Sequence, residues 1–367
     1  MNIFSDNRIV LTLDAGGTNF VFSALQKGES ITDDITKPSN AHDLNLCVQT
    51  IKDGFNEVME SLQEKPVAIS FAFPGPADYP NGIIGDLNNL PAFRGGVPLG
   101  GILEEYFKLP VYINNDGDLY AYGEALGGVL PELNQKLKDS GSPKRYNNLV
   151  GLTLGTGFGG GIVRNNELFI GDNSNAAEVW LFSNSKSAGK NAEDVVSIRA
   201  VQRAYAEEAG IEYPNELSPK DIYEIAKGSK EGNRQAALNS YKTMGHALGD
   251  TIANLLTFID GIVVIGGGIT GAAEFYMPAV LEEINSSFIP SNGIPLPRLV
   301  QKIFMLDDDN ESQGFYQNQS KQLKIPNSEK VAVYDPVPRL GIATTKIGAS
   351  KAISLGAYAF ALSKVNE

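Results

Sequence analysis

The sequence predicts an α/β fold divided into two lobes, each with a mixed β-sheet and flanking helices. Three observations lead to this prediction. The chain has 367 residues, more than one ordinary hydrophobic core accommodates. Apolar, strand-like runs lead into glycine-rich turns at three places: LTLDAGGTNF (11–20), VGLTLGTGFGGGIV (150–163) and IVVIGGGITG (262–271). A unit of strand, glycine turn and hairpin at 8–25 recurs at 148–170, and this coarse duplication indicates two similar lobes.

The composition excludes several classes of protein. The net charge of −13 disfavours nucleic acid as a partner, because an acidic surface repels phosphates. No apolar run is long enough to span a bilayer and the first residues lack a signal-peptide pattern, so we expect a cytoplasmic protein with no membrane partner. The only cysteine is Cys47 and the only histidines are His42 and His246, so we expect no intrachain disulfide and no zinc site.

Hydrophobic spacing assigns the elements of the first half of the chain. Residues 8–25 alternate around a glycine pair and predict a β-hairpin. Apolar residues at helical spacing predict a helix over 43–62. The elements that follow are a buried strand, a short helix, a second strand and a second helix, over 66–77, 98–108, 109–116 and 118–127.

The second half begins with a polar, turn-rich stretch at 131–148, which predicts an exposed connection and the boundary between the lobes. Asn165 and Asn166 lie between two apolar runs and predict a hairpin turn. The elements expected after them are a largely helical region, a strand and two further helices, over 194–258, 262–268, 273–288 and 352–362.

These elements define the predicted lobes. A small amino-terminal lobe covers 1–130 and is completed by the last helix, at about 352–367. A large carboxy-terminal lobe covers 131–351. Within it, the low-hydrophobicity section of 290–347 predicts an inserted loop or hairpin.

The loop after the first strand carries Asp14, then Gly16 and Gly17, then Thr18 and Asn19. Glycines let backbone N–H groups approach phosphate oxygens closely, and the two polar side chains add donors. Asp14 could hold Mg²⁺ directly or through water, because Mg²⁺ prefers carboxylate, water and phosphate oxygens. A plain hairpin turn is the alternative, but the segment is richer in polar groups than a turn requires. We therefore predict a phosphate and magnesium site here.

Gly155, Thr156 and Gly157 begin a segment with five glycines in seven residues. The segment fits the loose G-x-G-x-x-G pattern of dinucleotide-binding folds, which need a helix to begin at that loop. The following GIVRNNELFIG predicts a hairpin instead, so we reject NAD binding and retain phosphate binding. A merely flexible loop is disfavoured, because glycines cost backbone entropy.

Gly266, Gly267 and Gly268 end the third apolar run and precede a predicted helix. A flat group such as adenine or ribose could approach bare backbone there. A tight packing turn between strand and helix is an alternative that the sequence leaves open. No P-loop sequence occurs anywhere in the chain.

Asn115 and Asp116 follow the strand-like run VYIN. A carboxylate at a strand end can take the proton from a substrate hydroxyl as it attacks phosphorus. Alone, such a pair is more often a turn or a helix N-cap. The three glycine loops of the same chain favour the general base.

Glu178, Glu193 and Asn89 are candidate groups for binding sugar hydroxyls, since carboxylates and amides exchange hydrogen bonds with them. Each of them alone would be an ordinary surface or helix residue. Trp180, the only tryptophan, could stack on a sugar ring or belong to the core.

Taken in order, these segments resemble the ROK family (repressor, open reading frame, kinase) of sugar kinases. LTLDAGGTN is similar to the family's first phosphate loop, LTLGTGFGGGIV to the second and VVIGGGI to the adenosine loop. FAFPGPAD, NNLPAF and LPVYINNDGDLYAYGE are similar to its sugar-side segments. The resemblance implies a two-lobed actin-like ATPase fold, which is ribonuclease H-like, with duplicated mixed-sheet domains.

The resemblance also implies a glucokinase-type enzyme that transfers the γ-phosphate of Mg·ATP to a hexose hydroxyl, normally at C6. Asp116 would be the general base, and the sugar would be bound by Asn89, Asn115, Glu178 and Glu193. The residues facing ATP and magnesium would be Asp14, Gly16, Gly17, Thr18, Asn19, Gly155, Thr156, Gly157, Gly266, Gly267 and Gly268. A homodimer is common among such proteins and stays an open expectation.

The chain departs from the family after Glu178, where Val179, Trp180 and Leu181 stand and the family's histidine is missing. The cysteine cluster of its zinc site is absent as well, so we expect a divergent member without zinc. Glucose, other hexoses and N-acetylhexosamines stay open as substrates, as does polyphosphate as donor. Two alternatives are a catalytically weak sugar- or nucleotide-binding regulator of the same fold, and a chaperone-like or filament ATPase of the same superfamily.

Overall fold

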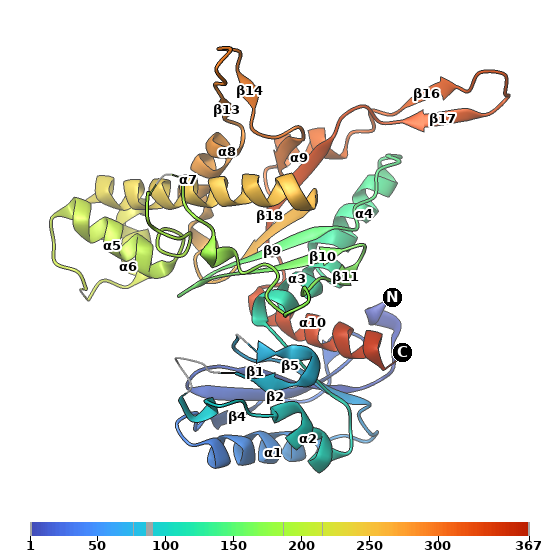
Figure 1. Ribbon diagram of the computed structural model, residues 1–367, viewed down its shortest axis with the longest axis vertical. Coiled ribbons are helices and arrows are strands. Elements are labelled where there is room, and N and C mark those ends of the chain that lie inside the picture. The colour runs from blue at the N-terminus through green and yellow to red at the C-terminus, as the bar shows by residue number, and fades with distance from the viewer. Residues whose placement is uncertain (1, 76, 86–90, 186, 215, 366–367) are drawn as a thin grey trace. The chain divides into compact units, whose positions relative to one another are not determined.

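A computed structural model of the chain describes residues 2–75, 77–85, 91–185, 187–214 and 216–365. The chain divides into two compact units (Figure 1). The first consists of Met1–Pro131, Gly161–Ala177 and Lys346–Glu367, and the second of Glu132–Gly160 and Glu178–Thr345.

The first sheet is built on the predicted hairpin, in which β1 (Val10–Ala15) pairs antiparallel with β2 (Asn19–Gln26), Val10 opposite Leu25. Beyond β1 the order continues with β5 (Ala68–Ala72) and β8 (Val111–Asn114), both parallel to it. On the other side β2 pairs with β3 (Glu29–Ser30) and β4 (Ile35–Pro38). Because β1, β5 and β8 are parallel, their carboxyl ends lie at one edge of the sheet.

Helices cover both faces of the first sheet (Figure 1). One face is covered by α1 (Leu44–Glu60) and α2 (Leu99–Phe107), and the other by α10 (Ala349–Lys364), on which α3 (Asp116–Leu126) packs. Asp43 caps α1 by accepting a hydrogen bond from Leu46 N–H. These elements confirm the strands and helices predicted from hydrophobic spacing in the first half of the chain.

The contact between α3 and α10 depends on glycine. A Cβ atom at Gly123 of α3 would lie 1.8 Å from the Ala352 carbonyl oxygen, and one at Gly356 of α10 would lie 1.9 Å from the Leu119 carbonyl oxygen. Any side chain at either position would therefore force the two helices apart.

The second sheet has the order β11-β10-β9-β12-β18-β15. Its hairpin consists of β9 (Leu149–Leu154) and β10 (Phe158–Arg164), and β10 turns into β11 (Glu167–Leu168) through Asn165 and Asn166. Both asparagines have positive φ angles, 54° and 62°, as a two-residue hairpin turn requires. The predicted turn is confirmed.

The other strands of this sheet are parallel to β9. They are β12 (Ile262–Gly266), β18 (Arg339–Thr344) and β15 (Lys302–Met305). The helices of the region are α5 (Ile198–Ala209), α6 (Pro219–Lys227), α7 (Arg234–Ile259) and α8 (Ala273–Ile284), and α7 packs along α8 and α5. The predicted helical character of 194–258 is confirmed, and that of 273–288 is confirmed as far as Ile284, whereas Ser287 and Phe288 form a short strand.

The prediction of an exposed connection at 131–148 is wrong over its first part, where the chain forms α4 (Val129–Asp139). Val129, Leu130, Leu133 and Leu137 are buried, so this polar stretch carries one apolar face. Those apolar residues are sparse, and the sequence alone did not reveal that they meet a core.

Only part of 290–347 lies outside the second sheet. β15 and β18 are strands of that sheet, and α9 (Asp309–Tyr316) packs on β15. Two hairpins stand apart from it, β13 (Ser287–Phe288) with β14 (Leu296–Pro297), and β16 (Lys321–Lys324) with β17 (Val331–Tyr334).

Short elements complete the described chain. β6 (Ala77–Asp78) pairs with β7 (Ile83–Ile84), and the 3₁₀ turns are Ile3–Ser5, Tyr79–Asn81, Pro91–Phe93, Val179–Leu181 and Thr270–Ala272.

Gly161–Ala177 belongs to the first unit. The sequence predicted this segment as part of the large lobe at 131–351. A Cβ atom at Gly161 would lie 2.3 Å from the Gly117 carbonyl oxygen of α3, so β10 follows α3 at close range. Among the described residues, no helix is both long and apolar enough to cross a membrane.

The close contact of α3 and α10 gives a test of the first unit. We expect Gly356→Ala to destabilise the protein by about 1–3 kcal/mol or more, because the added methyl group collides with backbone. Gly101→Ala on α2 is the matched control, since a Cβ atom there meets nothing within 4 Å and alanine stabilises a helix by roughly 0.5–1 kcal/mol. Thermal and urea unfolding of the three proteins would measure both effects, and equal behaviour of the two variants would contradict the close contact.

Candidate functional site

The first glycine loop joins β1 to β2. Asp14 lies near the end of β1 and Asn19 begins β2. A Cβ atom at Gly16 would lie 2.8 Å from the Asn19 carbonyl oxygen, so the turn itself needs glycine there, whereas one at Gly17 would meet no atom of the described residues within 4 Å. Gly17 is therefore open to a group from outside the chain.

Ser39 holds this loop from behind, and the sequence analysis missed it. Its amide donates to the Thr18 carbonyl oxygen at 2.9 Å, and its hydroxyl donates to the Gly17 carbonyl oxygen at 2.8 Å. Both bonds use carbonyl groups, so neither engages an amide of the loop, and Asp14, Thr18 and Asn19 are exposed. The loop presents donors and one carboxylate to solvent.

Asn115 and Asp116 lie at the carboxyl end of β8, the same edge of the sheet as the first loop. Asn115 is the N-cap of α3, and its Oδ1 accepts a hydrogen bond from Gly117 N–H at 2.8 Å. Its Nδ2 lies 3.5 Å from the Tyr79 hydroxyl, which donates to the Phe73 carbonyl oxygen. Asn115 is thus a helix N-cap, which was one of the alternatives that the sequence left for this pair. Its amide is oriented by Tyr79.

Asp116 is the first residue of α3 and is exposed to solvent. Loss of hydration raises the pKa of its carboxyl above the usual range, the hydrogen bond from Gly117 N–H opposes this rise, and the charge of Asp14 adds to it. Partial loss of water around its carboxyl group also raises the pKa of Asp14, although the residue as a whole is exposed. Because the charge of Asp14 disfavours the charge on Asp116, a proton or a cation would bind readily to these carboxylates.

A magnesium ion fits these residues chemically. Mg²⁺ is commonly held by one or two carboxylates, with water and substrate phosphate oxygens as its other ligands. Asp14 and Asp116 could supply such carboxylates, and the amides of the Gly16–Thr18 turn could hold the phosphate.

The second and third glycine loops lie together in the second unit. β9 and β12 are parallel neighbours, with Gly266 opposite Thr153, so the loops that follow them share one edge of the sheet. Gly267 has φ +96°, and its Cβ atom would lie 2.3 Å from the Leu154 carbonyl oxygen. Gly267 is therefore required by a tight turn between strand and helix, which is the alternative to a ligand site that the sequence left open.

The glycines on either side of that contact differ from Gly267. Among the residues that the structure describes, a Cβ atom at Gly155 would have no neighbour within 4 Å, and one at Gly268 would have Ile198 alone, at 3.9 Å. Because the fold does not require glycine at these two positions, their bare backbone is available to a ligand. The second loop leads into the hairpin of β10 and β11, and no helix begins there, which agrees with the rejection of NAD binding.

Glu193 supports the second loop. Its Oε2 accepts a hydrogen bond from Phe158 N–H at 3.0 Å, and its Oε1 lies 3.1 Å from the Arg199 guanidinium. A Cβ atom at Gly157 would lie 2.8 Å from the same carboxylate, so Gly157 makes room for Glu193. This supporting role was not visible in the sequence, because it joins residues 35 positions apart.

Glu178 accepts a hydrogen bond from the indole N–H of Trp180, two residues later. Trp180 is 37% exposed. The alternative that placed this residue in the core is therefore wrong. Asn89, the remaining predicted sugar-binding residue, lies outside the described residues.

The structure thus gathers the predicted residues into two sets. The set in the first unit comprises Asp14, Gly16, Gly17, Thr18, Asn19, Asn115 and Asp116, and the set in the second unit comprises Gly155, Thr156, Gly157, Glu178, Glu193, Gly266, Gly267 and Gly268.

Comparison with known proteins identifies relatives of the whole chain. The sequence model of the ROK family matches residues 10–303. A solved glucokinase from Parabacteroides distasonis is 48% identical, with 99% of each chain covered and a TM-score of 0.91. The glucokinase of Halalkalibacterium halodurans is 26% identical over 77% of this chain and 87% of its own. The N-acetyl-D-glucosamine kinase of Vibrio parahaemolyticus is 29% identical over 72% of this chain and 85% of its own. The predicted fold class is confirmed.

The role of Glu193 can be tested at the Phe158 amide. We expect Glu193→Ala to speed hydrogen exchange at that amide, on the order of tenfold, because it removes an acceptor that contributes roughly 1.5 kcal/mol. Arg199→Ala is the matched control, since it removes the other partner of Glu193 and leaves the bond to Phe158. Unchanged protection of Phe158 in Glu193→Ala would show that the carboxylate does not hold the loop.

Proposed function

The chain belongs to the ROK family, and on this premise we propose that it is an ATP-dependent sugar kinase. It transfers the γ-phosphate of ATP to a hydroxyl group of a hexose, most simply O6 of glucose or of a related hexose or N-acetylhexosamine. The observation that carries this proposal is Asp116, a carboxylate with a raised pKa at the sheet edge where the Asp14 loop also ends.

Asp116 is the general base of the proposed reaction. Its carboxylate takes the proton of the sugar hydroxyl while the hydroxyl oxygen forms a bond to the γ-phosphorus. The bond from that phosphorus to the β–γ bridging oxygen breaks, and ADP leaves. A raised pKa suits this role, because a stronger base accepts a proton more readily once it is ionised.

The nucleotide would be held by the three glycine loops. The amides of Gly16, Gly17, Gly155 and Gly157, with the side chains of Thr18, Asn19 and Thr156, would bind the phosphates. Gly268 would leave space for the adenosine, with Gly266 and Gly267 shaping its turn. Magnesium, held by Asp14 directly or through water, would neutralise charge on the phosphates.

The sugar would be held by Asn89, Asn115, Glu178 and Glu193. In the structure the indole of Trp180 occupies one oxygen of Glu178, and Glu193 is engaged with Phe158 and Arg199. These engagements favour a second candidate function, a sugar- or nucleotide-binding regulator with weak catalysis. The exposed Asp116 and the open glycines support the kinase over this regulator.

The kinase is tested by an ADP-release assay over a panel of hexoses and N-acetylhexosamines. We expect turnover with at least one sugar, and we expect Asp116→Asn to lower kcat by about 10²–10⁴-fold, because the amide cannot accept the proton. Asp53→Asn, an exposed change on α1 in the same unit, is the control. Folded protein that binds ATP and turns over no sugar would establish the regulator instead.

The pH dependence of the reaction gives an independent test. Only ionised Asp116 accepts the proton, so activity should fall as the pH drops through the raised pKa of this residue. The acid limb of kcat/KM for the sugar should therefore lie above the usual aspartate pKa of about 4. Asp14→Asn removes a neighbouring charge that raises this pKa, so in the protein without magnesium and nucleotide it should lower the pKa of Asp116, as an NMR titration of the carboxyl carbon would measure. An unchanged Asp116 pKa in this variant would rule out the coupling.

A further inference from the structure

The second unit contains a cavity of about 440 Å³. Its walls are formed by α7, by the end of α8 and the start of β13, and by the segment 183–185. None of the predicted site residues that the structure describes lines it. Small-molecule sites in proteins have volumes of roughly 300–1,000 Å³, so the cavity has room for a small organic ligand.

The most buried side chains that line the cavity form one charged set. Arg298, just after β14, forms ion pairs with Asp250 of α7 and Glu283 of α8, and the three side chains are 10%, 3% and 6% exposed. The Ser185 amide also donates to Asp250, at 3.2 Å. Burial raises the pKa of Asp250, but the hydrogen bonds from Arg298 and Ser185 outweigh burial and hold the pKa below its usual value. This buried carboxyl therefore stays ionised.

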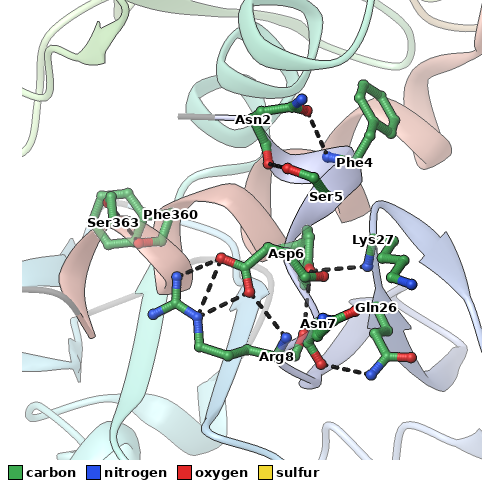
Figure 2. Close-up of polar contacts among 11 residues, drawn as sticks. Asn2, Phe4, Ser5, Asp6, Asn7, Arg8, Gln26, Lys27, Phe360 and Ser363 are labelled. Atoms are coloured by element: carbon green, nitrogen blue, oxygen red, sulfur yellow. Dashed lines mark hydrogen bonds and ion pairs between the residues drawn. The ribbon is translucent and has the colours of Figure 1, made fainter.

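An ion pair between chain neighbours is a different case. In the first unit Asp6 pairs with Arg8, two residues along the chain, and their side chains are 18% and 28% exposed (Figure 2). Such a pair orders one turn. The charged set instead joins α7, α8 and the residue after β14, and its two carboxylates hold the guanidinium from two sides. The planar guanidinium is therefore oriented before a ligand arrives, which lowers the ordering cost of binding.

The wall at 183–185 is ordered by the chain itself. Ser183 forms an isolated β-bridge with Asn191, and the Asn184 amide donates to the Lys190 carbonyl oxygen at 3.2 Å. These bonds close the segment into a loop. The loop therefore keeps its shape as a wall of the cavity without help from a ligand.

The rest of the lining can exchange hydrogen bonds in both directions. It consists of four serines, two asparagines and Phe288. Serine hydroxyls and asparagine amides both donate and accept. Phe288 is 54% exposed, and its ring centroid lies 5.8 Å from the Arg298 guanidinium. The cavity thus combines fixed charges, adaptable polar groups and one apolar ring.

The charges of the cavity decide the kind of ligand that fits it. Two carboxylates face one guanidinium, and a protonated His246, 3.6 Å from Glu283, would only balance the set, so an anion is disfavoured. Among the described residues, no three histidine, cysteine or acidic side chains are grouped as a metal site. Hydroxyl groups fit, because they can donate to carboxylates and accept from amides and a guanidinium.

We propose that this cavity is a second binding site, which takes a neutral sugar or another polyhydroxyl compound. Ligand hydroxyls donate to Asp250 and Glu283, since a carboxylate offers about four acceptor positions, and they exchange hydrogen bonds with Asn254 and the serines. The C–H face of the ligand lies against the Phe288 ring. The proposal does not rest on the kinase reaction, because the cavity shares no lining residue with the catalytic and nucleotide residues proposed above.

The test is an NMR titration of the ¹⁵N-labelled full chain that follows the Phe288 amide. The neutral probes are D-glucose, N-acetyl-D-glucosamine and sucrose, and inorganic phosphate is the charged probe. We expect at least one neutral probe to shift this amide saturably, with a Kd below about 10 mM. Asn254→Leu should raise that Kd by about tenfold, because it removes hydrogen bonds to the ligand.

Asn239→Leu is the matched control, since it makes the same change on α7 outside the cavity and should leave the Kd unchanged. Asp116→Leu should also leave it unchanged, which separates this cavity from the proposed catalytic site. Ser287→Trp, a bulky change at an exposed lining position, should weaken binding as well and serves if Asn254→Leu does not fold. Circular dichroism and melting temperature of each variant would establish its folding.

Three results would overturn the proposal. The first is the absence of a saturable shift with any neutral probe up to about 50 mM. The second is a folded Asn254→Leu or Ser287→Trp variant that binds as tightly as the unmodified chain, or an Asp116→Leu variant that loses the shift. The third is phosphate binding more tightly than every neutral probe, which would assign the cavity to an anion.

Discussion

The close approach of α3 and α10 is the constraint on which the first half of the site depends. α3 begins with Asp116, and α10 lies on the sheet that ends in the Asp14 loop. Because Gly123 and Gly356 allow backbone to touch backbone, α3 is held at a depth that brings its first residue to the carboxyl edge of that sheet. Asn115 then fixes the start of the helix by capping it. The position of the proposed base is thus set by residues that take no part in chemistry.

The glycines of the three loops fall into two groups with different physical causes. Gly16, Gly157 and Gly267 are needed by the fold, since a side chain would collide with backbone or with Glu193. Gly17, Gly155 and Gly268 have open space around them. A glycine that the fold does not require still loses more conformational entropy on folding than other residues, and no contact within the chain compensates for this loss. A ligand that must approach the backbone closely explains such glycines. The open positions in the loops therefore indicate nucleotide binding more directly than the number of loops does.

The second unit shows how a polar region can be ordered by a few buried contacts. The section predicted as an insertion contains two strands of the main sheet, and the hairpin of β16 and β17 that leaves it is anchored by the buried ion pair of Arg339 and Asp335. Leaving either of these charges alone in the interior would be costly, so the pair and its neighbours define where the hairpin begins. Without that anchor, an exposed hairpin with an apolar edge strand would be expected to fray.

Local pattern alone determined much of this protein. Alternation around Gly16 and Gly17, the Asn165-Asn166 turn and the helical spacing of 43–62 predicted elements whose hydrogen bonds are formed between near neighbours, and the ordered segments identified the family. Tertiary structure decided what depends on residues far apart in the sequence. It turned 129–139 into a helix by offering a core to four apolar residues, placed β15 and β18 in the main sheet, and engaged Glu193 with an amide 35 positions away. A sequence records which groups are present, whereas the partners of a buried or half-buried polar group are chosen by the fold.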